Sequence, residues 1–301
     1  MVLLDSMVSR EGPAWQRQLA LECLSEWCAQ ERFEDKIREL YSAWSGVGQE
    51  DRNPLVSLSL SLERVVQRHV GPLLQASAPP AAVQQARAAA EAVEAHALRP
   101  RPRLLEAVSH AGHEPPPGMV TDVAGLYLAI DCVCRLACGV SRLCGVTPLA
   151  DSDPLIMSST PRCDEQVMLQ NVEVTRSIID RTWQYSLASL QAVMVTVSSP
   201  VLLSRVLGSY ASFARACGAL QLLGPRDKAI APLCRSALPG TSSGGPVVLK
   251  PYNILISKVL LRLVFELGGV LGEAWLLVLE AMQRLDTALS ERGLPPGSGP
   301  A

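Results

Sequence analysis

The sequence predicts an all-α fold, an armadillo/HEAT-like helical-repeat solenoid with a Pro/Ala-rich linker. Hydrophobic residues make up 48% of the 301-residue chain and aromatic residues only 4%, which favours helices packed through aliphatic side chains over a β-sandwich. No segment alternates polar and apolar residues with the period of two expected of a half-buried strand. The apolar stretch 247–289 carries Lys258, Arg262 and Glu266 at helical spacing, so these three residues form one polar stripe.

The first region, residues 1–75, is expected to hold the end of one helix and several further helices. Residues 1–8 have the apolar pattern of a helix end, and Gly12-Pro13 restarts a helix because proline suits a first helical position. The residues expected to face the core are Trp15, Leu19, Leu21, Cys23, Leu24, Trp27, Phe33, Ile37, Leu40, Tyr41, Leu58, Leu62, Val65, Val66 and Val70.

Residues 76–118 are expected to form a partly ordered linker, because the composition changes there to Ala, Pro and Arg. The segment contains Pro79-Pro80, Pro100-Arg101-Pro102 and Pro115-Pro116-Pro117. Residues 81–98 can form an alanine-rich helix, whose buried side is expected to be thin because alanine buries little apolar area.

Residues 119–293 are expected to form a second helical region, followed by a flexible tail over 294–301. Gly224-Pro225 is expected to end a helix that begins after Ser199, and Gly268-Gly269 to separate the last two helices. Two helices that are each too apolar to stand alone are the unit of an α-solenoid, and about ten to twelve helices are expected in all. The expected helices are 120–146, 166–197, 200–223, a short one ending near 238, and the last pair, with loops over 151–164 and 239–246. The apolar sides expected in the last pair are Leu260, Leu261, Leu263, Val264 and Leu267, then Trp275, Leu276, Leu277, Leu279 and Met282.

Charge and cysteine content indicate a cytosolic protein without a nucleic-acid partner. The net charge is −2 and the pI about 6.1, so no basic field attracts nucleic acid and no polybasic cluster binds anionic lipid. The nine cysteines are odd in number and lie mostly in apolar helical patterns, which favours reduced thiols. The N-terminus contains Asp5 and is expected to be neither a signal peptide nor an anchor. No window reaches the roughly 18 uncharged apolar residues of a membrane span, and the closest, 252–279, carries charged residues, so no transmembrane segment is expected.

Two groups of residues were weighed as metal ligands. Cys132, Cys134, Cys138 and Cys144 have a spacing that matches no common zinc pattern, and on a helix Cys132 points away from Cys134 and Cys138. Small side chains in helix packing are the favoured interpretation. His110 and His113 lie beside Glu114 in a Pro-rich segment, where solvated loop histidines are the favoured interpretation.

The chain has no motif that predicts catalysis, so no catalytic, cofactor-binding or metal-binding residue is assigned. It contains neither G-x-S-x-G, nor G-x-G-x-x-G, nor a Walker loop. A nucleic-acid surface was weighed as well, but apolar turns separate its members and Asp180 and Glu173 balance their charge. Those members are Arg181, Trp183, Arg205, Tyr210 and Arg215.

Four segments resemble the monensin-sensitivity (Mon-two) family of large Golgi and endosome trafficking proteins. That family is related to the large Sec-seven-type Arf guanine-nucleotide exchange factors, outside their catalytic domain. The first segment, 5–41, matches a motif at Trp15, Arg17, Leu21, Glu22, Cys28 and Tyr41. The second is 125–143, and the third is 179–239, with a Trp-containing helix, then Arg-Asp, Cys and Leu-Pro. The fourth, 250–289, matches at Gly269, Val270, Leu271, Gly272, Trp275, Val278, Leu279, Gln283 and Leu285.

The order and spacing of the four segments agree with that family, whereas the linker at 76–118 does not match. The family's proteins are much longer, so the chain is expected to correspond to an internal slice, and its start within a helix fits a fragment or a truncated gene product. Residues 1–75 then correspond to the end of the N-terminal homology (HUS-like) region, and 119–293 to the start of the C-terminal helical repeats.

The resemblance implies a non-catalytic scaffold in vesicle-mediated transport between endosomes and the trans-Golgi network. A Dopey-family protein and Arf/Arl-type small GTPases are the implied partners, and the implied location is cytoplasmic and peripheral on those membranes. Two alternatives remain open. One is a regulatory helical region of an Arf guanine-nucleotide exchange factor, and the other is a helical-repeat adaptor unrelated to trafficking.

Overall fold

The fold is all-α, as the sequence predicts, in the part of the chain that the computed structural model describes. The described residues are 13–44, 53–75, 78–97, 104, 108, 121–145, 165–197, 199–238 and 249–293. Every regular element among them is helical. The helices are α2 (Ala14–Cys28), α3 (Phe33–Ala43), α4 (Pro54–Leu74), α5 (Pro80–Ala97), α7 (Asp122–Leu143), α8 (Glu165–Thr196), α9 (Pro200–Ala219), α10 (Leu223–Ser236), α11 (Pro251–Leu267), the 3-10 turn η2 (Gly268–Val270) and α12 (Ala274–Gly293).

Two central helices begin at residues that satisfy the free N–H groups of a first turn. Asn53 accepts a hydrogen bond from the Leu55 amide (3.0 Å), and Pro54 occupies the first helical position of α4. Thr121 Oγ1 accepts a hydrogen bond from the Ala124 amide (3.1 Å) at the start of α7. The helix α7 lies within the predicted helix 120–146 and is shorter than it by a few residues.

The break between α9 and α10 lies earlier than Gly224-Pro225, where the sequence predicts it. The helix α9 ends at Ala219, Gln221 adopts a left-handed φ of 55°, and α10 begins at Leu223. Pro225 belongs to the first turn of α10, where its missing N–H costs no helical hydrogen bond. The proline therefore lies in the first turn of the second helix and does not end the first helix.

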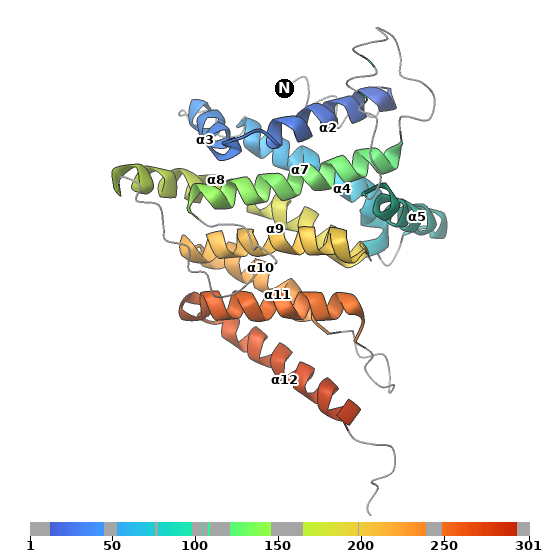
Figure 1. The fold of residues 1–301 in the computed structure, drawn as a ribbon, viewed down its shortest axis with the longest axis vertical. Helices are drawn as coiled ribbons and strands as arrows, with labels where there is room; N and C mark the ends of the chain where they lie inside the picture. Colours follow the sequence, from blue (N-terminus) through green and yellow to red (C-terminus); the bar gives the residue numbers. More distant parts are fainter. Residues whose placement is uncertain are drawn as a thin grey trace, which may run out of the picture.

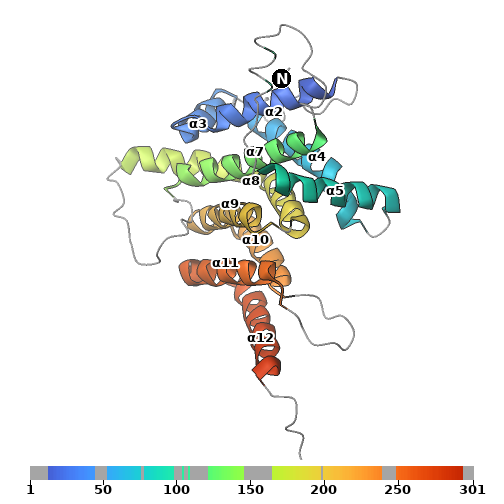
Figure 2. The ribbon, with the colours of Figure 1, turned by 45° about the vertical axis from the view of Figure 1, so that its right-hand side comes forward.

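The helices stack in layers along the long axis of the molecule, from α2 and α3 at one end to α12 at the other (Figure 1). The turned view in Figure 2 keeps this order, with α9 and α10 between α8 and α11. The central helix is α7, which packs against α2, α3, α4, α5, α8 and α9. Helices from either side of residues 98–118 thus pack on one another, since α2 contacts α7 and α4 contacts α8.

The predicted inner sides of two helices are confirmed. Phe33, Ile37 and Tyr41 of α3 are buried, and Leu40 is half-buried against the core. All five predicted positions of α4 are buried. In α2 the prediction is only partly right, because the helix turns toward α7 a side with smaller residues than the predicted one. The buried residues of α2 are Gln18, Ala20, Leu21 and Cys28, while Leu19, Cys23, Leu24, Trp15 and Trp27 are only half-buried.

The alanine-rich segment forms α5, which packs against α4 and α7. Its buried side chains include Ala86, Ala90 and Val93, so the expectation of a thin buried side is confirmed. Several other segments with a prediction, residues 1–8, 110–118, 151–164, 239–246 and 294–301, lie outside the described residues.

The Gly268-Gly269 break is confirmed, but the helix after it packs differently from the prediction. The turn η2 and a left-handed Gly272 (φ 51°) separate α11 from α12, and α12 packs on α10. Small residues face that contact, since Ala274, Val278 and Ala281 are buried. The prediction that four leucines face the core is wrong, because Leu276, Leu277 and Leu279 of α12 and Leu261 of α11 are exposed.

Among the described residues, one helix is long and apolar enough to span a membrane by length and composition. It is not the segment 252–279, which was expected from the sequence to come closest to a membrane span. The helix in question, Val123–Leu143, has a mean hydropathy of 1.7. It is the central helix α7, and 72% of its most apolar window is buried inside the protein. A buried core helix meets the same criteria, so the segment is weak evidence for a span.

Candidate functional site

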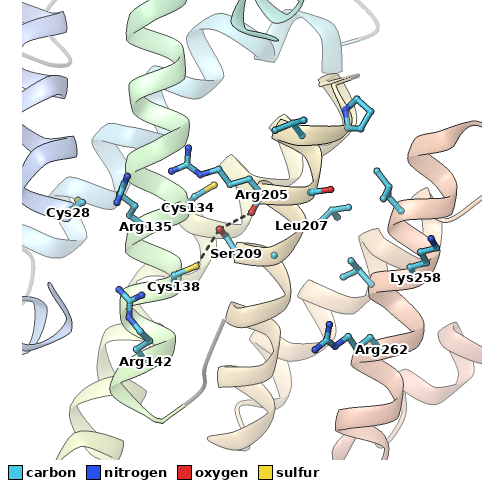
Figure 3. Close-up of a pocket in the computed structure, with 16 residues that line it drawn as sticks. Cys28, Cys134, Arg135, Cys138, Arg142, Arg205, Leu207, Ser209, Lys258 and Arg262 are labelled. Carbon is cyan, nitrogen blue, oxygen red and sulfur yellow. Dashed lines mark hydrogen bonds between the residues drawn. The ribbon is translucent and has the colours of Figure 1, made fainter. Parts of the chain in front are cut away.

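A groove of about 920 Å³ runs between α7, α9 and α11. Figure 3 shows α9 at its floor, with α7 on one side and α11 on the other. The helices reach this arrangement because α9 packs against both neighbours. Gly218 permits the close contact with α11, since a Cβ at this position would lie 2.6 Å from Leu267 Cδ2.

Among the described residues that line the groove, five carry cationic side chains and none carries a carboxylate. Arg135 and Arg142 come from α7, Arg205 from α9, and Lys258 and Arg262 from α11 (Figure 3). A groove with low-dielectric walls and one sign of charge concentrates anions. The chain's net charge is −2, so this positive region is local.

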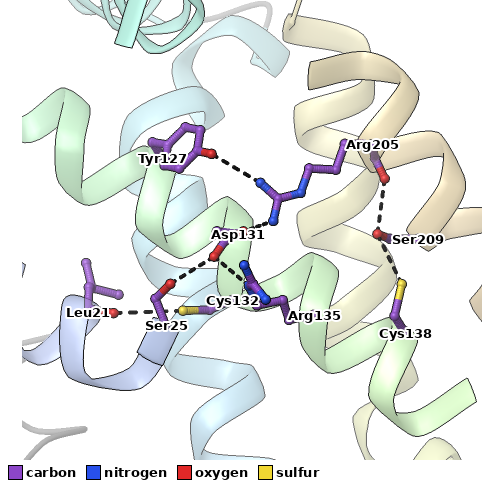
Figure 4. Close-up of polar contacts among 9 residues, drawn as sticks. All are labelled: Leu21, Ser25, Tyr127, Asp131, Cys132, Arg135, Cys138, Arg205 and Ser209. Carbon is purple, nitrogen blue, oxygen red and sulfur yellow. Dashed lines mark hydrogen bonds and ion pairs between the residues drawn. The ribbon is translucent and has the colours of Figure 1, made fainter. Parts of the chain in front are cut away.

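A buried carboxylate holds two of these arginines. Asp131 on α7 is 5% exposed, and its carboxylate accepts hydrogen bonds from Arg135 Nε (2.8 Å) and from Arg205 Nη2. Ser25 Oγ of α2 donates a third (2.8 Å), and Arg205 Nη1 donates to Tyr127 OH (3.1 Å). This network, drawn in Figure 4, ties α2, α7 and α9 together, with two guanidinium groups on one carboxylate.

The cations at the rim differ in their partners. Arg142 lies 3.3 Å from Glu34 of α3, and Arg262 lies 3.4 Å from Glu266. Glu266 is shared, because Arg215 Nε lies 2.5 Å from it. Lys258 makes no ion pair with any residue in the described ranges. Lys258 therefore keeps its positive charge available to a ligand.

Cys132 and Cys134 of α7 are buried and stay protonated at neutral pH, whereas Cys138 is half-buried. Cys138 Sγ donates to Ser209 Oγ of α9 (3.5 Å), and burial raises the pKa of Cys134 to about 12. Cys132 lies on the other side of α7, with its Sγ 4.0 Å from Leu21 O. A hydrogen bond with Cys28 is the main cause that raises the pKa of Cys132 well above its ordinary value, and burial is the second cause. Thiols with raised pKa values are weak nucleophiles, and these behave as small apolar side chains.

The predicted divergence of Cys132 from Cys134 and Cys138 is therefore confirmed. Within the described part of the chain, no group of His, Cys, Asp and Glu residues is arranged to hold a metal ion. Cys163, His110 and His113 lie outside that part.

The residues weighed as a nucleic-acid surface do not share one face. Tyr210 is fully buried, and its hydroxyl donates to Ala229 O (2.8 Å). Arg205 and Arg215 bind separate carboxylates, Asp131 and Glu266. Trp183 packs partly buried against the core.

The residues that carry the family resemblance are divided between core and surface. Leu21, Cys28, Tyr41, Leu271 and Val278 are buried. Leu279 and Gln283 are exposed. The groove was not assigned from the sequence, although Arg135 and Arg142 stand seven residues apart on one side of a largely apolar helix, which is a signal of a polar groove edge.

Searches of protein-family models, of curated proteins and of solved structures found no match to this chain.

Proposed function

We propose that the chain is a non-catalytic scaffold for vesicle-mediated protein transport between endosomes and the trans-Golgi network. It acts through protein–protein contacts on a cytoplasmic surface peripheral to those membranes. A Dopey-family protein and Arf/Arl-type small GTPases are the proposed partners. The resemblance of four segments to the Mon-two family supports the trafficking role. The sequence assigns no catalytic residue, so a scaffold is proposed rather than an enzyme.

The observation that carries the binding role is the open groove across three packed helices. A cleft of about 920 Å³ with an apolar floor and cationic edges offers a surface for recognition. We also propose that the layered helices α8 to α12 form part of an armadillo/HEAT-like array. Stacked helices with their layers along one axis support this, because solenoids present long surfaces of this kind to partners.

Co-precipitation from cells tests the proposed role. The full 301-residue chain, tagged and expressed in cultured cells, is expected to recover a Dopey-family protein or an Arf-like GTPase and to overlap a trans-Golgi marker. A folded chain that stays diffuse and recovers neither partner contradicts the proposal. A chain carrying Gly139→Ala, which crowds the α3–α7 contact outside the groove lining, serves as the control for recovery that depends on folding.

A further inference from the structure

The charge of the groove exceeds what its own carboxylates neutralise. Asp131, Glu34 and Glu266 form ion pairs with four of the five lining cations, and Lys258 forms none in the described part of the chain. Arg135 and Arg205 share the single carboxylate of Asp131. Lys258 and one of the two charges on Arg135 and Arg205 therefore lack a counter-charge at the groove, which favours an anionic ligand.

The cations are spread out, so they fit an extended ligand better than a compact one. Arg135 and Arg142 are about 10 Å apart along α7, and Lys258 and Arg262 about 6 Å apart along α11. These pairs stand on opposite sides of α9 (Figure 3). A single phosphate group contacts one such position, whereas a chain with several carboxylates reaches more than one.

Apolar side chains lie between the two charged edges. Val201, Leu207, Leu255 and Val259 line the groove, and Val201 is 65% exposed. The lining residues in the described ranges include no aromatic side chain, whereas single-stranded nucleic acid is usually held by stacking on aromatic side chains. An apolar floor between cationic edges matches a peptide that carries aliphatic and acidic side chains.

We propose that the groove between α7, α9 and α11 binds an acidic, amphipathic peptide segment of a partner protein. Aliphatic side chains of the segment pack on Val201, Leu255 and Val259, and its Asp and Glu side chains pair with Arg142, Lys258 and Arg262. This inference rests on the proposed role as a protein-binding scaffold, and not on the assignment to endosome-to-Golgi transport.

Selection of displayed peptides tests the proposal without a known partner. Random peptides of about 16 residues, ~24 Å long as a helix, are displayed on phage and selected against the immobilised full chain. Fluorescein-labelled copies of the selected peptides are then titrated by fluorescence anisotropy. We expect the selected peptides to be enriched in Asp, Glu and aliphatic residues, and their affinity to fall as salt is raised.

Two variants place the site in the groove. Lys258→Glu reverses an exposed charge that has no ion-pair partner in the described residues, and Val201→Glu adds a carboxylate in the first turn of α9, where acidic residues are favourable. Each is expected to weaken peptide binding about tenfold or more. Lys228→Glu makes the same change at an exposed position outside the lining and is expected to leave affinity unchanged. Circular dichroism checks that all three are folded.

Several outcomes overturn the proposal. These are recovery of no binding peptide, selection of neutral or basic peptides, and equal binding by wild type, Lys258→Glu and Val201→Glu. Binding of a labelled single-stranded RNA or of phosphoinositide vesicles that the selected peptides fail to displace also overturns it. Acidic peptides that bind in the groove, together with a failed co-precipitation in cells, refute the trafficking role alone.

Discussion

At the scale of single residues, Asp131 shows how the fold holds charge in an apolar helix. A carboxylate that is 5% exposed is costly unless donors surround it, and Ser25, Arg135 and Arg205 supply them from three helices. The same contacts fix the two arginines that line the groove. One buried residue therefore supports both the packing of α2, α7 and α9 and the position of the groove's inner cations.

Replacing Asp131 by Asn keeps the shape of the side chain and removes its charge. We expect Asp131→Asn to lower the free energy of unfolding by about 2–3 kcal/mol, because Arg135 and Arg205 lose their shared counter-charge. Urea denaturation followed by circular dichroism measures it. The exposed Asp180→Asn is the matched control, expected within about 0.5 kcal/mol of wild type. Equal stability of the two variants contradicts the role given to Asp131.

The buried thiol of Cys134 predicts a loss of stability at alkaline pH. Its pKa in the folded protein is about 12 because of burial, against an ordinary value of 9.0. Between these values the folded state keeps the proton and the unfolded state releases it, so stability falls as pH rises. The difference in unfolding free energy between wild type and Cys134→Ala is expected to be constant below about pH 8. Above pH 9 it is expected to shrink by about 1.4 kcal/mol per pH unit. Denaturation curves of both proteins from pH 7 to pH 10.5 measure it, and parallel pH profiles contradict the prediction.

At the scale of elements, two glycines in neighbouring helices have opposite surroundings. A Cβ at Gly139 of α7 would lie 2.8 Å from Ile37 Cδ1 and 2.9 Å from Phe33 Cδ1, and both of these α3 side chains are buried. Nothing lies within 4 Å of the same position at Gly208 of α9. The first glycine lets two helices approach each other. The second has no such role and only adds conformational freedom to the unfolded chain.

The same substitution at these glycines is therefore expected to have opposite effects. Gly139→Ala is expected to lower the unfolding free energy by about 1–3 kcal/mol through overpacking. Gly208→Ala is expected to raise it by about 0.5–1 kcal/mol, because alanine favours a helix interior. Thermal unfolding of both variants measures the shifts. A stabilised Gly139→Ala protein would mean that α3 and α7 are packed less closely than the structure describes.

The sequence predicts the elements of this protein better than their orientation. Helix positions follow from local signals such as Asn53-Pro54, and those signals act within a single turn. Which side of a helix is buried depends on its neighbours, as α12 illustrates. Its larger side chains suggested an inward leucine face, but contact with α10 buries Ala274 and Val278 instead. For a similar reason, the groove was not predicted. Arg142 and Lys258 become opposite edges of one groove only because α9 packs between their helices.

At the scale of the whole molecule, the stack has an apolar end. Phe265 of α11 is 90% exposed, and Leu276 and Leu279 of α12 are 72% and 57% exposed. Leu276 and Leu279 are three residues apart and so share one side of α12. Exposed apolar residues grouped in this way favour association between molecules in water.

Replacing both exposed leucines by lysine is expected to reduce association without weakening the fold. Neither Leu276 nor Leu279 contributes a buried side chain, so Leu276→Lys/Leu279→Lys is expected to keep the wild-type Tm within about 2 °C while lowering light scattering in concentrated samples. Val278→Ala provides the contrast, because Val278 is 1% exposed and lies between those two positions in the sequence. It is expected to lower the unfolding free energy by about 1–2 kcal/mol and leave the scattering at or above the wild-type level. If the double variant unfolds at a much lower temperature, these leucines are buried in solution by a contact that the isolated chain does not show. Unchanged scattering with an unchanged Tm instead assigns the association of this chain to another surface.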